Sequence, residues 1–141
     1  MLTYYHGTTR PAAEAIIKNI DVSKGCGELG QGFYIGSSLW RAFSWAWNKA
    51  QKEGAEYRVI AFQIDEKQFG QLDILCQNTQ STRETYKRLK QSDLTTHWTS
   101  HHDAIWAPIV GQNIKNVYQI KFESVHGEYF INKQKKYMLC N

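Results

Sequence analysis

Three short segments of the sequence carry side chains that could act together on one substrate. The first runs from His6 to Thr8, the second runs from Gly32 to Tyr34, and the third begins at Glu128, directly after a glycine. A histidine, an aromatic ring and a carboxylate at strand ends form a set suited to binding a nucleotide sugar and to stabilising a cationic transition state. Each segment taken alone is more often structural, as a hydrogen-bonded spacer or as a turn beside a core aromatic.

A helix is expected directly after the second segment, capped by Ser37 or Ser38. Trp45 falls off the centre of the apolar stripe of this helix, toward one flank, which predicts that its indole lines a cleft. The residues of the stripe recur at helical spacing and are expected to face the core: Leu39, Ala42, Phe43, Ala46 and Ala50.

The remaining elements follow from periodicity and from turn residues. Alternation predicts strands over residues 2–6, 58–65, 103–110, 117–122, 128–131 and 137–140. Pro11 through Ile17 is expected to be a helix that ends at Asn19 in the left-handed conformation. Turns are expected at residues 7–9, 111–113 and 126–127, and residues 66–80 are expected to be irregular. A chain that begins with strand and helix and ends in a run of strands indicates an α+β fold.

Length and composition are those of one globular domain spanning residues 1–141. The chain has 42% hydrophobic and 21% charged residues, with a formal charge of +4. This charge suits an anionic ligand or nucleic acid, although ordinary soluble domains carry it too. No segment reads as a signal peptide or a membrane span, so we expect a cytoplasmic protein that contacts no membrane, or one delivered by a specialised secretion machine.

The sequence favours neither a disulfide framework nor a metal site. Its three cysteines are an odd number without close pairing. His97, His101 and His102 lie among threonine and serine residues that make a poor helix for ligands four residues apart, so we expect no metal.

A further helix is expected to begin at a capping box formed by Ser81 and Glu84. Its remaining surface is basic, and a solvated face is the simpler interpretation, with a nucleic-acid contact as the alternative. The cations concerned are Arg83, Lys87, Arg88 and Lys90.

The order and spacing of three motifs resemble those of the ADP-ribosyltransferase superfamily. These motifs are Y-H-G-T-T, then G-x-G-F-Y-I followed by W-A, then G-E-Y-F-I-N. Within the superfamily they are similar to the His-Tyr-Glu branch of diphtheria-toxin-like and poly(ADP-ribose)-polymerase-like domains, over Tyr5 to Leu139. The resemblance implies a split β-sandwich, with helices flanking two antiparallel-rich sheets, that uses NAD as its substrate and needs no metal.

The resemblance also implies a role for each matching residue. His6 would bond ribose hydroxyls of NAD, and Gly7 would grip the nicotinamide carboxamide through its backbone. Tyr34 and Trp45 would sandwich the nicotinamide, with an indole where tyrosine is usual. Glu128 would bond the nicotinamide ribose and stabilise the oxocarbenium-like transition state, a role that a fixed carboxylate performs well. Thr8 and Gly32 belong to the same NAD-binding segments.

Two departures from the family pattern bear on the reaction. Ala42 stands where polymerase-like relatives carry a serine, so one hydrogen bond to the carboxamide is missing. His126 replaces the Glu or Gln of arginine-specific transferases, so arginine is not the expected target. The acceptor side would then involve His126 together with Arg83, Lys87 and Arg88.

The sequence therefore predicts a mono-ADP-ribosyltransferase that acts as a toxin or effector on a protein or nucleic-acid acceptor. An antitoxin or immunity protein is a further candidate partner. Two alternatives stay open: an NAD glycohydrolase, and a catalytically silent module that binds NAD or ADP-ribose.

Overall fold

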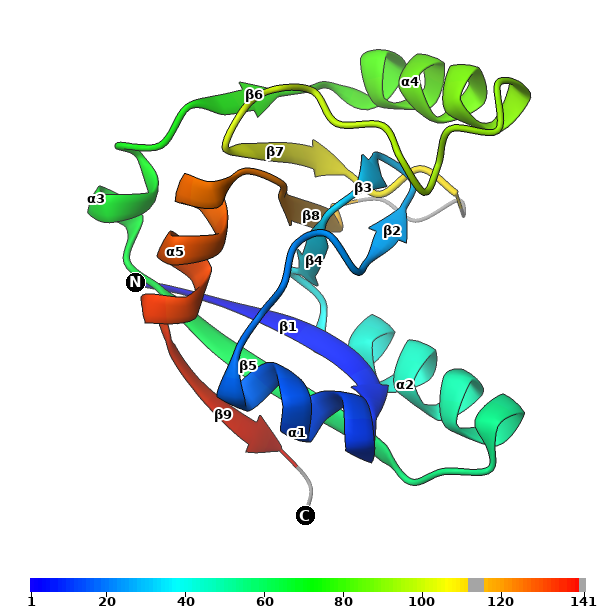
Figure 1. Cartoon of the computed structure of the whole chain (residues 1–141), viewed down its shortest axis with the longest axis vertical. Helices are drawn as coiled ribbons and strands as arrows, with labels where there is room; N and C mark the ends of the chain where they lie inside the picture. Colours follow the sequence, from blue (N-terminus) through cyan, green and yellow to red (C-terminus); the bar gives the residue numbers. More distant parts are fainter. Residues whose placement is uncertain (112–115, 140–141) are drawn as a thin grey trace.

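A computed structural model describes residues 1–111 and 116–139, which form a mixed α+β fold with one seven-stranded sheet and five helices (Figure 1). In spatial order the strands are β6 (Ile74–Cys76), β7 (Ala104–Pro108), β8 (Tyr118–Phe122), β4 (Phe33–Gly36), β1 (Leu2–Thr9), β5 (Tyr57–Ile64) and β9 (Lys135–Leu139). β6 and β7 run parallel and the other neighbours run antiparallel. β2 (Cys26–Gly27) and β3 (Gly30–Gln31) form a separate ribbon, so the described strands make one seven-stranded sheet and a short ribbon, where the resemblance implied two antiparallel-rich sheets.

The seven-stranded sheet has a seam between β1 and β4. These two strands are in register at one pair of residues, Tyr5 with Gly36, whereas β1 and β5 pair along their whole length. The seam separates β6, β7, β8 and β4 from β1, β5 and β9, and Figure 1 shows these two groups of strands lying apart beyond that point.

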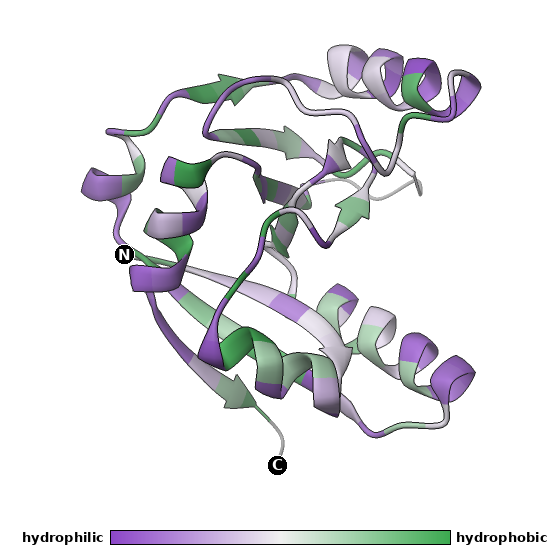
Figure 2. Cartoon of the chain, viewed as in Figure 1, coloured by the Kyte–Doolittle hydropathy of each residue, from purple (hydrophilic) through white to green (hydrophobic). Residues whose placement is uncertain are grey.

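Helices cover both faces of the sheet. They are α1 (Arg10–Lys18), α2 (Leu39–Glu53), α3 (Glu66–Phe69), α4 (Thr79–Gln91) and α5 (Val125–Lys133). On one face, α1, α3 and α5 enclose the main core around Phe33, Phe62 and Phe130. Figure 2 shows the apolar character of α1, whose Ala13 is fully buried in that core. On the other face, α2 covers β1 and β5, and α4 packs against β7.

The structure confirms the helix from Pro11, the helix after the second motif, and the central strand near residues 58–65. Ser38 caps α2, since its hydroxyl accepts from the backbone N–H of Arg41 at 3.2 Å, and the apolar stripe faces β1. Gly54 ends α2 in the left-handed conformation with φ of 65°, which glycine adopts without strain. β5 is buried on both faces, as its unbroken apolar run indicates.

The strand expected at residues 128–131 and the turn at 126–127 are wrong, because this segment is helix α5. Ser124 begins the helix by accepting from the N–H of Gly127 at 2.9 Å, and Phe130 and Ile131 then point into the core from adjacent helical positions. A short apolar run fits a buried strand or a buried helix equally well, and the cap decides it here.

Four further expectations need correction. β1 continues through residues 7–9, where a turn was expected, and Asn19 is extended with φ of −165°. α4 begins at Thr79, where Asn78 and Ser81 form the capping box that was expected from Ser81 and Glu84. Residues 66–80 contain α3 and β6 and are not irregular throughout. Most of the turn expected at residues 111–113, and the end of the last strand at residue 140, lie outside the described residues.

Candidate functional site

His6 lies at the seam and joins the first motif to the second. Its Nδ1 stands 2.6 Å from the carbonyl oxygen of Tyr34, and because a carbonyl only accepts, Nδ1 carries the hydrogen. The imidazole stacks on Phe33 with ring centroids 4.6 Å apart and planes inclined by 24°. Two segments far apart in the sequence are therefore locked together by one side chain.

The second nitrogen of His6, Nε2, is open to a ligand. No described residue hydrogen-bonds it, and the one buried side-chain atom without a partner among the described residues belongs to Gln77. Burial lowers the pKa of His6 to about 4; the bond to the Tyr34 carbonyl opposes this shift and the charge of Lys49 adds to it. The ring is neutral at physiological pH, so Nε2 can accept a hydrogen bond from a hydroxyl.

Gly7 lies directly beneath α2. A Cβ at this position would stand 1.9 Å from the carbonyl oxygen of Ala42 and 3.1 Å from the Cβ of Ala46. The absence of a side chain at Gly7 therefore lets α2 pack directly on β1, independently of any contact between the Gly7 backbone and a ligand. Thr8, the next residue of the predicted NAD-binding segment, is also buried.

Tyr34 holds the loop that precedes it. Its hydroxyl donates to the carbonyl of Gly30 at 2.6 Å and accepts from the N–H of Leu29 at 3.0 Å. One face of the ring meets Gly27, where a Cβ would lie 2.9 Å from Cζ. Burial raises the pKa of Tyr34 well above its usual range, so the phenol stays protonated and acts as a clamp.

Gly32 makes room for a buried lysine. A Cβ on Gly32 would lie 2.5 Å from Cγ of Lys121, whose ammonium group donates to the carbonyl of Leu29 at 2.7 Å and pairs with Glu123 at 2.8 Å. Close packing accounts for this glycine without a ligand.

Trp45 is largely exposed, with 65% of its surface open, so it does not line an enclosed cleft. Lys49, one turn further along α2, carries the charge that acts on His6, which places this flank of the helix near the seam. Among the described residues no ring contact joins Trp45 to Tyr34. A flat ligand between Trp45 and Tyr34 would therefore have to contact each ring itself, since the two rings do not touch each other.

Glu128 lies in the first turn of α5, where its Oε1 accepts from the N–H of Val22 at 3.0 Å. Asn132 strengthens the same junction by bonding both the N–H and the carbonyl of Ile20. Within the described residues no hydrogen bond or ion pair joins Glu128 to His6 or to Tyr34. In the structure, the hydrogen bond from Val22 to Glu128 links α5 to the loop after α1.

The sheet separates Glu128 from the predicted ring pair. Side chains alternate along β4, so Phe33 faces the main core with α5, and Tyr34 faces the opposite side, where it packs in a cluster with Leu29, Ile105 and Trp98. His6 is stacked on Phe33 on the α5 side, although its Nδ1 reaches back to the seam. The structure thus joins His6 to the main chain of Tyr34, and it places Glu128 on the same side of the sheet as the His6 ring and on the other side from the Tyr34 ring.

A carboxylate that the sequence analysis missed lies on the same side as Tyr34. Oε1 of Glu28 accepts from the N–H of Val110 at 3.1 Å and from Nε2 of Gln119 at 3.0 Å. Gln119 is in register with Gly36 beside the seam, and the charge of Glu28 contributes to the raised pKa of Tyr34. The one sequence signal for Glu28 is its place among glycines just before G-x-G-F-Y.

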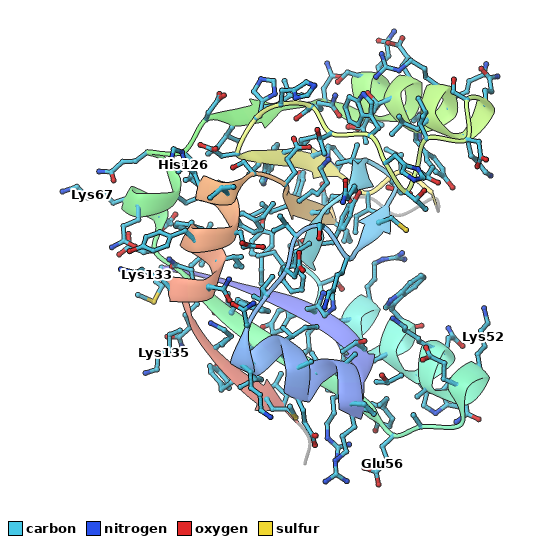
Figure 3. All side chains as sticks on the ribbon, viewed as in Figure 1. Lys52, Glu56, Lys67, His126, Lys133 and Lys135 are labelled. Atoms are coloured by element: carbon cyan, nitrogen blue, oxygen red, sulfur yellow. The ribbon has the colours of Figure 1, made fainter. Side chains whose placement is uncertain are left out.

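The predicted acceptor-side residues do not form one group. Arg83, Lys87 and Arg88 are exposed on α4, and the Arg88 guanidinium lies 5.4 Å from the ring centre of Trp98. Figure 3 shows His126 at the start of α5, away from α4, and its imidazole is 3.9 Å from Asp103.

Two further findings concern residues 1–111 and 116–139. No group of three or more His, Cys, Asp or Glu side chains stands ready to hold a metal ion there. No helix in this part of the chain is long and apolar enough to cross a membrane.

Comparison with models of protein families, with curated proteins and with solved structures finds no match to this chain.

Proposed function

We propose that this protein cleaves NAD at the glycosidic bond and transfers one ADP-ribose to a macromolecule. The observation that carries the proposal is the hydrogen bond from His6 to the Tyr34 carbonyl. It joins the two motifs expected to hold the nicotinamide end of NAD, and it leaves a neutral imidazole with an open acceptor nitrogen.

The chemistry assigns a task to each group at the seam. Nε2 of His6 accepts from a ribose hydroxyl, and the exposed indole of Trp45 stacks on the nicotinamide against Tyr34. As the C–N bond breaks, nicotinamide leaves with the bonding electrons and positive charge develops on the ribose. An acceptor oxygen or nitrogen then bonds to the same carbon and releases its proton to water.

We infer that Glu28 supplies the negative charge for this step. Two donors fix its Oε1, so the carboxylate needs little reorganisation as charge develops, and it faces the same side as Tyr34. Glu128, which the motif comparison favours, lies on the side of the sheet where the His6 ring stacks on Phe33, but its Oε1 is engaged with Val22.

The seam between β1 and β4 supports the fold that the proposal requires. A split sandwich needs two groups of strands that part from each other, and a single register pair joins the two groups here. We therefore propose the ADP-ribosyltransferase-like fold together with the activity.

The decisive experiment measures nicotinamide release from NAD, with and without a cell lysate. We expect His6→Ala to abolish release and His102→Ala to leave it intact. His102 is a matched control, because it is also partly buried and its Nδ1 lies 2.9 Å from a carbonyl oxygen, that of Ser100. Equal rates in the two variants, with both still folded, would contradict the proposal.

The fate of the label separates transfer from its alternatives. Labelled ADP-ribose that resists removal from macromolecules indicates transfer, whereas nicotinamide release without any labelled macromolecule indicates a glycohydrolase. Binding of NAD without release would identify a silent module.

A further inference from the structure

Helix α2 exposes three large aromatic side chains to solvent. Trp40 is 81% exposed, Trp45 is 65% exposed and Trp47 is 53% exposed, although they belong to one 15-residue helix. Exposed tryptophan is rare at this density on a surface without a function, since each ring leaves a large apolar area in water.

Two of these rings border a hollow. It is lined by Trp40, Phe43, Ser44, Trp47 and Tyr57. Phe43 forms its floor, with its ring centre 6.3 Å from those of both Trp40 and Tyr57. Trp40 and Trp47 stand two helical turns apart, and Ser44 adds a hydroxyl between them. A flat heterocycle with polar edges fits such a lining better than an aliphatic chain does.

The charge of the helix is complementary to phosphate. Arg41 and Lys52 lie on α2 between the flank of Trp40 and that of Trp45, whereas Lys49 lies on the flank near His6, and Glu53 is the single acid of the helix. Figure 3 shows Lys52 extending outward from the last turns of α2. Rings interleaved with cations bind a strand whose bases stack and whose backbone is anionic.

We propose that the exposed face of α2 binds single-stranded nucleic acid, with one unpaired base in the hollow and a neighbouring phosphate beside Lys52. The inference rests on the proposed function, since this strand would be the macromolecule that receives ADP-ribose. It places the acceptor surface on α2, the other flank of which lies near His6, whereas the sequence analysis placed this surface on α4.

Binding is tested without NAD, so that failure here is separate from failure of the proposed reaction. Fluorescence anisotropy of a labelled single strand of about 12 nucleotides is compared with that of a duplex of equal length. We expect the single strand to bind at least tenfold more tightly, because paired bases cannot enter the hollow. Affinity should fall with salt by about 0.7 logarithmic units per phosphate contacted for each tenfold rise.

Variants then locate the surface. The double variant Trp40→Ala/Trp47→Ala should weaken single-strand binding by roughly tenfold or more, through lost stacking. Tyr129→Ala is the matched control, because Tyr129 is 63% exposed and has the ammonium of Lys133 4.6 Å from its ring centre, yet lies on α5. Its affinity should stay within about twofold of the original.

Charge reversal gives a second measurement that does not depend on the aromatic variants folding. Lys52→Glu should weaken binding by several fold, and Lys67→Glu, an exposed cation on α3, should not. Nicotinamide release measured without any acceptor should be unchanged in the double tryptophan variant, because neither ring belongs to the proposed NAD site.

Three outcomes would overturn the inference. They are equal affinity for single strand and duplex, equal loss in the α2 variants and their controls, and absence of nucleic-acid binding while a protein takes up the label. The last result would assign the hollow to a protein acceptor.

Discussion

The imidazole of His6 donates a hydrogen bond to a main-chain carbonyl, which stabilises the charged imidazolium only weakly. A carboxylate in this place would favour the imidazolium, whereas a neutral carbonyl does so weakly and burial with Lys49 outweighs it. The ring therefore keeps one donor for the protein and one acceptor for a ligand.

The lowered pKa of His6 makes the stability of the fold depend on pH. The unfolded chain binds a proton near pH 6.5, and the folded protein binds it only near pH 4. Between these values the unfolded state holds more protons, so stability from this group is full above pH 6.5 and is lost as pH falls toward 4. At about 1.4 kcal/mol per pKa unit, we expect a loss of about 3 kcal/mol.

Urea unfolding at several pH values checks this expectation. The difference in unfolding free energy between the original protein and His6→Asn should shrink as pH falls through this window. A constant difference for His6→Asn would show that His6 is protonated at an ordinary pKa.

Two single substitutions decide which carboxylate serves the reaction. Glu28→Gln should reduce the rate of nicotinamide release by a factor on the order of a hundred, with NAD affinity nearly unchanged, because it removes the charge and keeps the shape. Glu128→Gln should cost stability of about 1 kcal/mol or less and keep the rate, since its amide oxygen can still accept from Val22. The reverse pattern in single-turnover kinetics would restore the motif-based role of Glu128.

At the scale of elements, α2 lies directly against the backbone of β1 at Gly7. Gly7→Ala would drive a methyl group into the carbonyl of Ala42, so we expect a loss of about 2–4 kcal/mol as the helix lifts from the strand. Gly36→Ala, on β4, is the control, because a Cβ there would meet nothing closer than the Tyr118 carbonyl at 3.7 Å. Chemical denaturation of both variants measures the difference, and a tolerated Gly7→Ala would contradict the close approach.

Periodicity was a good guide to the long elements and a poor one to the short ones. The stripe of α2 and the two-sided apolar run of β5 follow directly from spacing, because each is long enough for its period to be counted. α5 has nine residues with little amphipathic character, and its start depends on one capping side chain, Ser124. Glu128, expected at the start of a strand, therefore lies in the first turn of a helix.

At the scale of the whole molecule, ligand binding should couple the two halves of the sheet. A non-hydrolysable NAD analogue bound across the seam would stabilise the folded state by about 2.7 kcal/mol at a hundredfold excess over its Kd. Hydrogen exchange should slow in both β1 and β4, which lie on opposite sides of the seam. Protection confined to one half would mean that the ligand does not span the seam.

The order of the strands could not be predicted from the sequence. β4 pairs with β8 and β5 pairs with β9, so the partners lie far along the chain, and local patterns do not encode which distant strand is chosen. The same distance hid Glu28, whose bonding partners Val110 and Gln119 come from much later segments.

That strand order also sets when the molecule can become active during its synthesis. β1 and β5 can pair once the first 64 residues have been made, but β4 has no partner on its outer side until residues 118–122 of β8 follow. Pairings between distant segments form slowly, because the intervening loop must first be closed. An activity that needs β4 paired on both sides would therefore begin only after β8 has been synthesised.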